Sequence, residues 1–393
     1  MNIREFLLDP AIALPIKRCP VELRHEGFPE FVEGILGTYR EKLGQLDGFE
    51  NDLCNVLQMV KHFSKGAMCA INAAFAGHPA VAYTHFTSAI QPITQLLLEK
   101  PLHFGPKGYT FFYRVRDDVI VELKRKELFH RPFEDRHLVS EERYSVPGLP
   151  CLYLGGSLLT CWKEKNRPQF EKLTAAAFWI PTNELKLLFV ADRPARLILF
   201  VNHDGTVQEY ELDHARDCGH APDAIKSMFV RFLQTWPLAA LCSMEVQFTN
   251  AKWNPEYIIP QLLLQWVANY PEFDGICYFS VRVEEVTDDF VPTCCVVLPA
   301  REICCKGVCD RLRRLLRMTE PKRWAELSAN WTGDDPDAQK NYRPDFLMTS
   351  NGGGSAHYVD SGFVDAEWTL NRHAINLRRS NDAGMTVAGD VTR

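Results

Sequence analysis

The sequence predicts an α+β protein in which a helical N-terminal region precedes a mixed sheet. Two observations carry this prediction. Apolar residues recur every three or four positions through much of roughly the first hundred residues, which is the spacing of amphipathic helices. Beyond that region, short apolar runs of strand length are interspersed with helical segments. Because the order lacks a regular βαβ rhythm, α+β is favoured over a doubly wound sheet.

The N-terminal region, residues 1–105, is expected to hold three helices. The clearest apolar stripe runs from Phe28 to Leu46, and further helices are predicted over Asn51–Phe63, with a less regular continuation, and over about Val81–Leu98. Proline and glycine then cluster from Glu99 to Gly108, which marks the predicted domain boundary. Amphipathic helices need an apolar partner surface, and we interpret this region as an accessory or regulatory domain.

Residues 106–325 form the predicted mixed domain. Strands are expected at Tyr109–Val115, Leu149–Gly156, Ala195–Val201 and Thr293–Pro299, and helices near Ser157–Lys165, Asp223–Thr235 and Pro260–Tyr270. Residues 326–393 are polar and lack sustained periodicity, so they are predicted to form a partly mobile tail in which Phe346, Tyr358 and Trp368 could dock locally.

The composition excludes several classes of protein. With 46% hydrophobic and 24% charged residues, the chain resembles ordinary soluble proteins and is not disordered throughout. Its net charge of -6 argues against a nucleic-acid binder that neutralises many phosphates. No apolar run approaches the roughly 20 residues that span a bilayer, and no secretion signal is evident. A cytoplasmic protein without a membrane partner is therefore expected.

The cysteines are expected to be reduced thiols, and no metal site is predicted. There are 13 cysteines, an odd number, and none forms a CxxC pair. The nearest approach to a metal motif, Cys305 to Cys309, has no histidine beside it. Buried or half-buried thiols that act as small apolar groups explain this composition better.

Two arginines share one face of the first predicted strand. Arg114 and Arg116 are two residues apart, and alternate residues of a strand point to the same side. Arginines in such a position are most often solvated, so this segment alone does not indicate a site. The sequence has no phosphate-binding loop of the GxxxxGK[ST] type, no HExxH and no GxSxG.

The segment that begins at Glu142 combines a turn, a strand and the start of a helix. Ser157 can cap this helix, and the glycines before it could present N–H groups to a phosphate, although Gly-Gly-Ser before a helix is more often only a turn with an N-cap. Glu164 lies about two turns into the helix. Arg143, before the turn, and Tyr153, on the strand, could converge with it.

Taken in order, these segments resemble the RES domain family, which is named for a characteristic arginine, glutamate and serine. The matching pieces are Tyr113-Arg114-Val115, Arg143-Tyr144, Pro147-Gly148, Leu152-Tyr153-Leu154, Glu164, Pro260-Gln261 and Ser280. They cover Tyr109 to Leu298, about half of the chain. The resemblance implies a fold like that of ADP-ribosyltransferases, and an enzyme that breaks down NAD or transfers its ADP-ribose.

The resemblance also implies roles for individual residues. Arg114 and Arg143 would hold the pyrophosphate or a neighbouring ribose. Tyr153 would stack on nicotinamide, Glu164 would contact the nicotinamide ribose, and Ser280 would position the dinucleotide. The further candidates for binding NAD are Tyr144, Arg116, His130 and Ser157. Arg116, Arg136 and Arg143 compete with Arg114 for the position of the family's arginine.

These residue types suit cleavage of NAD. Breaking the bond between nicotinamide and ribose creates an oxocarbenium-like sugar, whose charge a nearby carboxylate stabilises. Arginine presents a planar fork of donors that matches phosphate oxygens. An aromatic face holds the cationic nicotinamide through stacking and cation–π attraction.

The leading hypothesis is an NAD-consuming glycohydrolase or phosphorylase that acts as a toxin or in phage defence, with NAD as substrate and no further cofactor. One alternative uses the same pocket to transfer ADP-ribose onto a macromolecule. Another is a non-catalytic binding or assembly module that acts through the N-terminal helices. Because uncontrolled loss of NAD would harm the cell, we expect restraint by an inhibitory or activating protein partner, as in toxin–antitoxin pairs, or by homo-oligomerisation.

Overall fold

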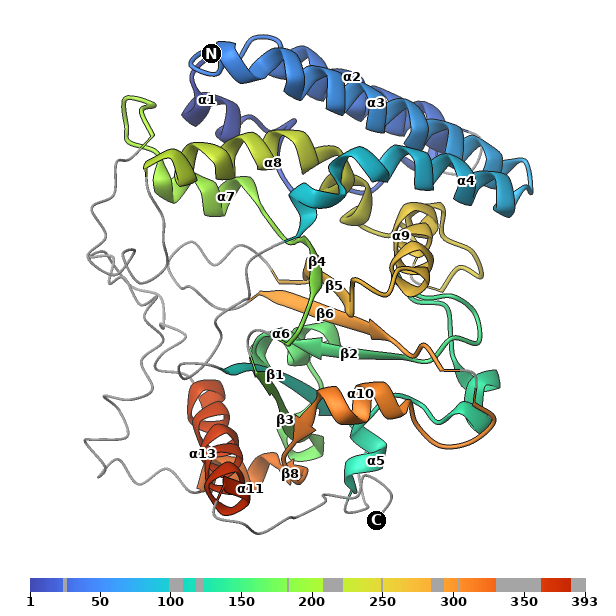
Figure 1. Cartoon of the computed structure of the whole chain (residues 1–393), viewed down its shortest axis with the longest axis vertical. Coiled ribbons are helices and arrows are strands. Elements are labelled where there is room, and N and C mark those ends of the chain that lie inside the picture. Colours follow the sequence, from blue (N-terminus) through green and yellow to red (C-terminus); the bar gives the residue numbers. More distant parts are fainter. Residues whose placement is uncertain are drawn as a thin grey trace. The chain divides into compact units, whose positions relative to one another are not determined.

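The chain is an α+β protein with an N-terminal helical region and a sheet, as the sequence predicts (Figure 1). The structure is a computed structural model. It describes residues 1–393 except 24–26, 99–108, 118–122, 182–183, 208–221, 249, 284–292, 303, 330–361 and 383–393.

Two compact units divide the chain, and the polypeptide passes between them several times. The helical unit consists of Met1–Leu98, Glu142–Val146 and Leu188–Asn269. The sheet unit consists of Glu99–Glu141, Pro147–Leu187 and Tyr270–Arg393. This division differs from the three consecutive domains that the sequence predicts, because residues 188–269 join the N-terminal helices and the C-terminal segment joins the sheet.

The helical unit contains long helices and several short turns of helix. The longer elements are α1 (Ile3–Leu8), α2 (Phe28–Leu43), α3 (Glu50–Phe75), α4 (Pro79–Ile90), α8 (Pro222–Cys242) and α9 (Ile258–Asn269). The short ones are η1 (Val21–Leu23), η2 (Gln91–Leu97), α7 (Pro194–Leu197), η5 (Ile198–Phe200) and η6 (Pro255–Tyr257). Within the described residues, no helix is both long and apolar enough to span a membrane.

A pair of buried aromatic rings joins α2 to α8. The rings of Tyr39 and Trp236 stack with their centroids 4.0 Å apart. Each also uses its polar atom: the Tyr39 hydroxyl donates to the Leu233 carbonyl oxygen (2.7 Å), and Trp236 Nε1 donates to that of Ile12 (2.9 Å). Large aromatic side chains can be buried completely when their polar atoms find partners in this way.

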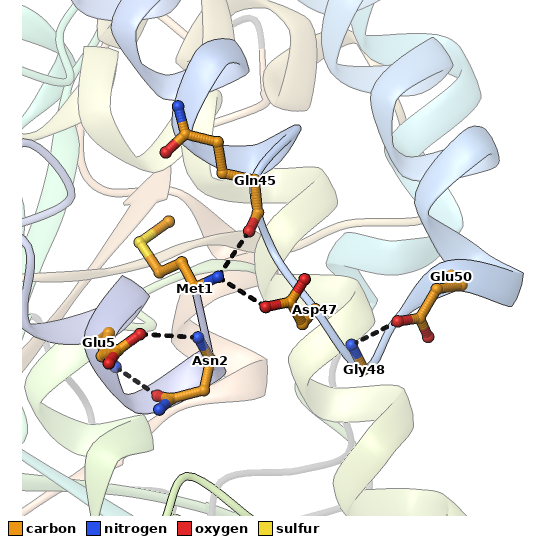
Figure 2. A network of polar contacts seen from close by, with 7 residues as sticks. All are labelled: Met1, Asn2, Glu5, Gln45, Asp47, Gly48 and Glu50. Carbon is orange, nitrogen blue, oxygen red and sulfur yellow. Dashed lines mark hydrogen bonds and ion pairs between the residues drawn. The ribbon is translucent and has the colours of Figure 1, made fainter.

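Polar contacts fix the first helix beside the turn between α2 and α3 (Figure 2). Asn2 and Glu5 form a capping box, in which each side chain accepts a hydrogen bond from the backbone N–H of the other. The Met1 amine donates to the Gln45 carbonyl oxygen (3.0 Å) and pairs with the Asp47 carboxylate (2.7 Å).

The prediction of a strand at Ala195–Val201 is wrong. This run forms α7 and η5 instead, followed by an isolated bridge between Val201 and Val207. Pro194 has the fixed φ that suits a first helical position, and a short apolar run does not by its pattern distinguish a strand from a buried helix.

The sheet unit is built on antiparallel strands. In their order across the sheet, the strands are β5 (Gly275–Phe279), β6 (Cys294–Pro299), β2 (Cys151–Gly155), β1 (Tyr109–Arg116), β3 (Thr174–Pro181) and β7 (Arg317–Met318). A further short strand, β8 (Lys322–Arg323), also pairs with β3. The helices are α5 (Arg125–Leu128), η3 (Phe133–Leu138), α6 (Leu158–Glu164), η4 (Phe170–Lys172), α10 (Asp310–Leu315), α11 (Trp324–Ala329) and α13 (Gly362–Asp382). β4 (Leu187–Val190) begins at the last residue before the chain enters the helical unit.

One face of β1 and β3 is covered by helices and forms a core. Phe111, Tyr113 and Val115 of β1 pack there with residues of α6, α11 and α13. Aromatic rings extend this core at its edge: Trp162 stacks on Phe170, and Phe170 stacks on Trp324. Because side chains alternate along a strand, Arg114 and Arg116 project from the other face.

Helix α13 lies in the part of the chain that the sequence predicts to be an aperiodic tail. Its residues Phe363, Ala366, Leu370 and Ala374 are buried in the core on β1 and β3, at helical spacing. Trp368 also lies on this helix, whereas Phe346 and Tyr358 are outside the described residues. The high polarity of the surrounding sequence conceals this narrow apolar stripe.

We predict that Gly275→Ala destabilises the sheet. A Cβ atom at this position would lie 2.2 Å from the Val297 carbonyl oxygen, so β5 and β6 would have to separate. The preceding Asp274 is also fixed, because its carboxylate pairs with Arg311 (2.6 Å) and accepts a hydrogen bond from the Lys186 N–H (3.0 Å). A loss of about 2 kcal/mol or more in unfolding free energy is expected from urea denaturation.

Gly362→Ala is the matched control for this substitution. The new Cβ would have Trp324 at 3.9 Å as its nearest neighbour, which is ordinary contact. Equal stability of the two variants would contradict the predicted conflict between strands β5 and β6.

Candidate functional site

Arg114 is placed by β1 with part of its guanidinium buried. It stands opposite Ala176 on β3, whose small apolar side chain offers it no hydrogen-bond acceptor. Within the described part of the chain, the buried Nη1 atom of Arg114 has no hydrogen-bond partner. Leaving a buried donor unsatisfied costs about 1–3 kcal/mol, and more for a charged group. Such a guanidinium is suited to an anionic ligand that supplies the missing acceptor.

The charged groups around Arg114 also favour the binding of an anion there. Burial, followed by the charge of Arg116, lowers the pKa of Arg114 to about 10, and Arg131 acts in the same direction. Cys161 and Tyr153 have the opposite effect on this pKa. Binding an anion stabilises a cluster of guanidinium groups, because the negative charge offsets the repulsion between their positive charges.

Glu164 is the last residue of α6. The N-cap of this helix is Ser157, whose buried hydroxyl accepts a hydrogen bond from the Thr160 N–H (3.1 Å) and donates one to the Thr160 side chain (2.9 Å). Ser157 therefore acts as the helix cap that its position predicts, and this contact uses its hydroxyl. The half-buried carboxylate of Glu164 lies 3.8 Å from Nε of Arg282.

Ser280 follows directly after β5 and is completely buried. Its N–H donates to the Thr293 carbonyl oxygen (3.0 Å), which ties it to the start of β6. Its Oγ atom accepts a hydrogen bond from the Arg282 N–H (3.1 Å). Ser280 and Glu164 therefore share Arg282 as a neighbour.

The thiol of Cys161 connects α6 to the strand that carries Arg114. It donates to the carbonyl oxygen of Tyr113 (3.1 Å), the residue before Arg114 on β1. Cys161 itself lies one helical turn before Glu164 on α6. Gly155 allows this approach, since a Cβ there would lie 2.6 Å from the sulfur. Burial raises the pKa of the Cys161 thiol to about 12, so it remains a donor at neutral pH rather than a nucleophile.

Arg143 and Tyr144 belong to the helical unit, whereas the other predicted site residues belong to the sheet unit. Arg143 donates to the carbonyl oxygens of Cys242 (3.2 Å) and Met244 (2.7 Å), and its guanidinium lies over the ring of Tyr257 at 5.3 Å from the centroid. Tyr144 is completely buried. Arg143 thus ties the end of α8 to the segment before β2.

His130 lies in the sheet unit, where both of its ring nitrogens are engaged. The Cys309 N–H donates to Nε2 (2.8 Å), so Nδ1 carries the proton and donates to the Arg131 carbonyl oxygen (2.8 Å). The ring is completely buried, and this burial lowers the pKa of His130 to about 4. His130 therefore supports the backbone of Arg131.

Several residues at the site carry no signal in the local sequence pattern. Arg131 and Arg282 reach it from loops. Two residues of α13 contact the elements that carry the site rather than the site itself: Glu367 accepts a hydrogen bond from the Leu158 N–H at the start of α6 (2.5 Å), and Asn371 donates to the Tyr113 hydroxyl (2.6 Å) in the core on the face of β1 opposite to Arg114. The helical spacing of the small and apolar residues around Glu367 is the one signal that could have revealed α13.

The comparisons with known proteins give one informative similarity. A Bacillus subtilis (strain 168) protein named "Putative toxin YopC" is 25% identical over 369 residues, which cover 91% of this chain and 80% of that protein. The similarity therefore extends through both units. No family model matches the chain, and no solved structure matches it. In the described residues, no three His, Cys, Asp or Glu side chains group in a way that could hold a metal ion.

We predict that His130 makes the protein less stable in mild acid. Its pKa of about 4 in the folded state is below its unfolded value of about 6.5, so the unfolded chain binds more protons between these values. The contribution to stability is complete above pH 6.5 and falls as the pH decreases toward 4. The expected total loss is on the order of 3 kcal/mol, measured by urea denaturation across this range.

His130→Gln is the control for this pH dependence. A glutamine can accept from the Cys309 N–H and donate to the Arg131 carbonyl, yet it does not titrate. The variant should show a weaker decline in stability below pH 6.5. An identical decline in both proteins would rule out His130 as its source.

Proposed function

We propose that this protein is an NAD-consuming enzyme that cleaves the bond between nicotinamide and ribose and acts as a toxin. The observation that carries the proposal is the buried, unsatisfied Nη1 atom of Arg114, with the charges of Arg116 and Arg131 near it. A pyrophosphate supplies the acceptors that this guanidinium lacks, and its two negative charges suit a cluster of arginines.

The same unit holds the carboxylate that the chemistry requires. Glu164 is held one helical turn beyond Cys161, whose thiol donates to the Tyr113 carbonyl oxygen next to Arg114, although α6 packs against the face of β1 opposite to the Arg114 side chain. In the proposed reaction the C–N bond breaks, and its electron pair leaves with nicotinamide. The Glu164 carboxylate stabilises the positive charge that develops on the ribose. Tyr153, half-buried on β2, is the proposed stacking surface for nicotinamide.

The second reactant completes the reaction and determines its class. Water that adds to the anomeric carbon and loses a proton gives a glycohydrolase, whereas a phosphate oxygen gives a phosphorylase. A side chain or a nucleic-acid group at this point gives an ADP-ribosyltransferase with the same pocket. Water or phosphate is our first choice, and the transferase is the alternative.

Arg131 is a better partner for Arg114 in this proposal than Arg143. Arg143 already uses donors on two backbone carbonyls of the helical unit. Arg131 lies in the sheet unit, and its charge acts on Arg114. We therefore assign the pyrophosphate to Arg114 and Arg131, with Arg116 as a further positive charge on the same strand face.

The proposed toxin role rests on the similarity to the Bacillus subtilis protein named "Putative toxin YopC". An enzyme that depletes NAD would harm the cell that makes it. We therefore extend the proposal to an antitoxin-like protein partner that restrains the enzyme, with the helical unit as the surface that such a partner contacts.

The proposal predicts that the purified protein releases nicotinamide from NAD and that two substitutions affect this release differently. Glu164→Gln removes the charge that stabilises the ribose cation, so kcat should fall about 100-fold or more. Arg114→Ala removes the contact with the pyrophosphate, so NAD binding should also weaken, with a higher KM. Nicotinamide release is followed by chromatography, with water or phosphate as acceptor.

Arg313→Ala is the matched control. Arg313 is a partly exposed arginine of the same unit that pairs with Asp310 (2.8 Å) on α10, so its loss should leave nicotinamide release unchanged. Full activity in both Glu164→Gln and Arg114→Ala would contradict the proposed site. Release only when a macromolecule is added would favour the transferase.

A further inference from the structure

Arg282 contacts Glu164, which the proposed reaction places at the ribose, and Ser280, which the family resemblance implies positions the dinucleotide. Its Nη1 atom donates to the Glu164 carbonyl oxygen (3.1 Å), and its Nε atom lies 3.8 Å from the Glu164 carboxylate. Its backbone N–H donates to Ser280 Oγ (3.1 Å). One residue thus joins the end of α6 to the end of β5.

The same guanidinium holds a sharp turn at the end of α6. Asn166 and Arg167 have φ values of 63° and 56°, in the left-handed region that residues other than glycine seldom adopt. Arg282 Nη1 also donates to the Asn166 side-chain oxygen. Left-handed residues persist where surrounding contacts determine the backbone, and they are often found at functional sites.

We propose that Arg282 is a positioning residue that fixes Glu164 for the cleavage of NAD. This inference rests on the proposed function. The 3.8 Å separation is too long for a hydrogen bond, so Arg282 orients the carboxylate without occupying the oxygens that the substrate needs. The hydrogen bonds to the Glu164 carbonyl and to Asn166 fix the backbone from which the carboxylate projects.

A guanidinium is the group that can make this set of contacts. It is planar, always charged, and offers five N–H donors in fixed directions. A lysine in its place could keep the positive charge near Glu164, but its compact ammonium does not reproduce the separate directions of Nε and Nη1. Because the Arg282 side chain is 41% exposed, charge attraction alone would hold Glu164 weakly. The hydrogen bonds are therefore the principal means of positioning.

The decisive experiment compares kcat and KM for nicotinamide release in wild type, Arg282→Ala, Arg282→Lys, Glu164→Gln and the Arg282→Ala/Glu164→Gln double variant. Arg282→Ala should lower kcat about tenfold and change KM less than about threefold, because NAD binding depends on the arginines near β1. Arg282→Lys should recover part of the lost kcat. Arg313→Ala, which removes a partly exposed arginine of the same unit, should match wild type.

The double variant separates positioning from independent effects. If Arg282 acts through the Glu164 carboxylate, then removing Arg282 in the Glu164→Gln background should cost little further activity. Two independent, multiplying losses would overturn the proposal, as would an unchanged kcat in Arg282→Ala. If Arg282→Ala does not fold, a fully active Arg282→Lys would overturn it equally. Wild-type protein that releases no nicotinamide with water, phosphate or a macromolecular acceptor would overturn the proposed function, and the role of Arg282 with it.

Discussion

The alternation of side chains along β1 is the constraint on which the candidate site depends. Tyr113 and its neighbours at two-residue spacing fill the core under α6, α11 and α13. This burial leaves Arg114 and Arg116 on the other face, because a slip of one residue would place two guanidinium groups in that apolar core. The register with β3, which pairs Tyr109 with Pro181 and Arg116 with Thr174, extends over the whole strand and makes such a slip costly.

The sequence pattern predicts several elements of each unit, but it gives no sign of β3, β7, β8, α10, α11 and α13 in the sheet unit. Strands β1, β2 and β6 and helices α6, α8 and α9 lie where alternation, helical spacing and capping residues indicate. The segment Ala195–Val201 fails because an apolar run of strand length carries no period that separates strand from buried helix. The return of residues 188–269 to the N-terminal helices also leaves no local trace, since it depends on contacts between distant segments.

The candidate site shows the same difference between local and distant information. Arg114, Glu164 and Ser280 are ordinary residues in isolation and gain meaning from their order along the chain. Arg282 gains meaning only from contacts across more than a hundred residues of sequence, with Glu164 and Asn166. Glu367 and Asn371 likewise lie more than two hundred residues from their partners, Leu158 and Tyr113, on the elements that carry the site. A polar residue in a loop has no periodicity that would reveal such a partner.

The interleaving of the two units also limits how such a protein can be divided. A cut after residue 105 removes α2, α3 and α4, but it leaves α8 and α9, which pack against α3 and α4, in the remaining chain. Those helices would then expose apolar surface, and loss of activity in such a truncation would report aggregation rather than regulation. Recombination at a single point in the gene meets the same obstacle. Each unit consists of three separate segments of the chain, so no single cut or fusion point separates one complete unit from the other.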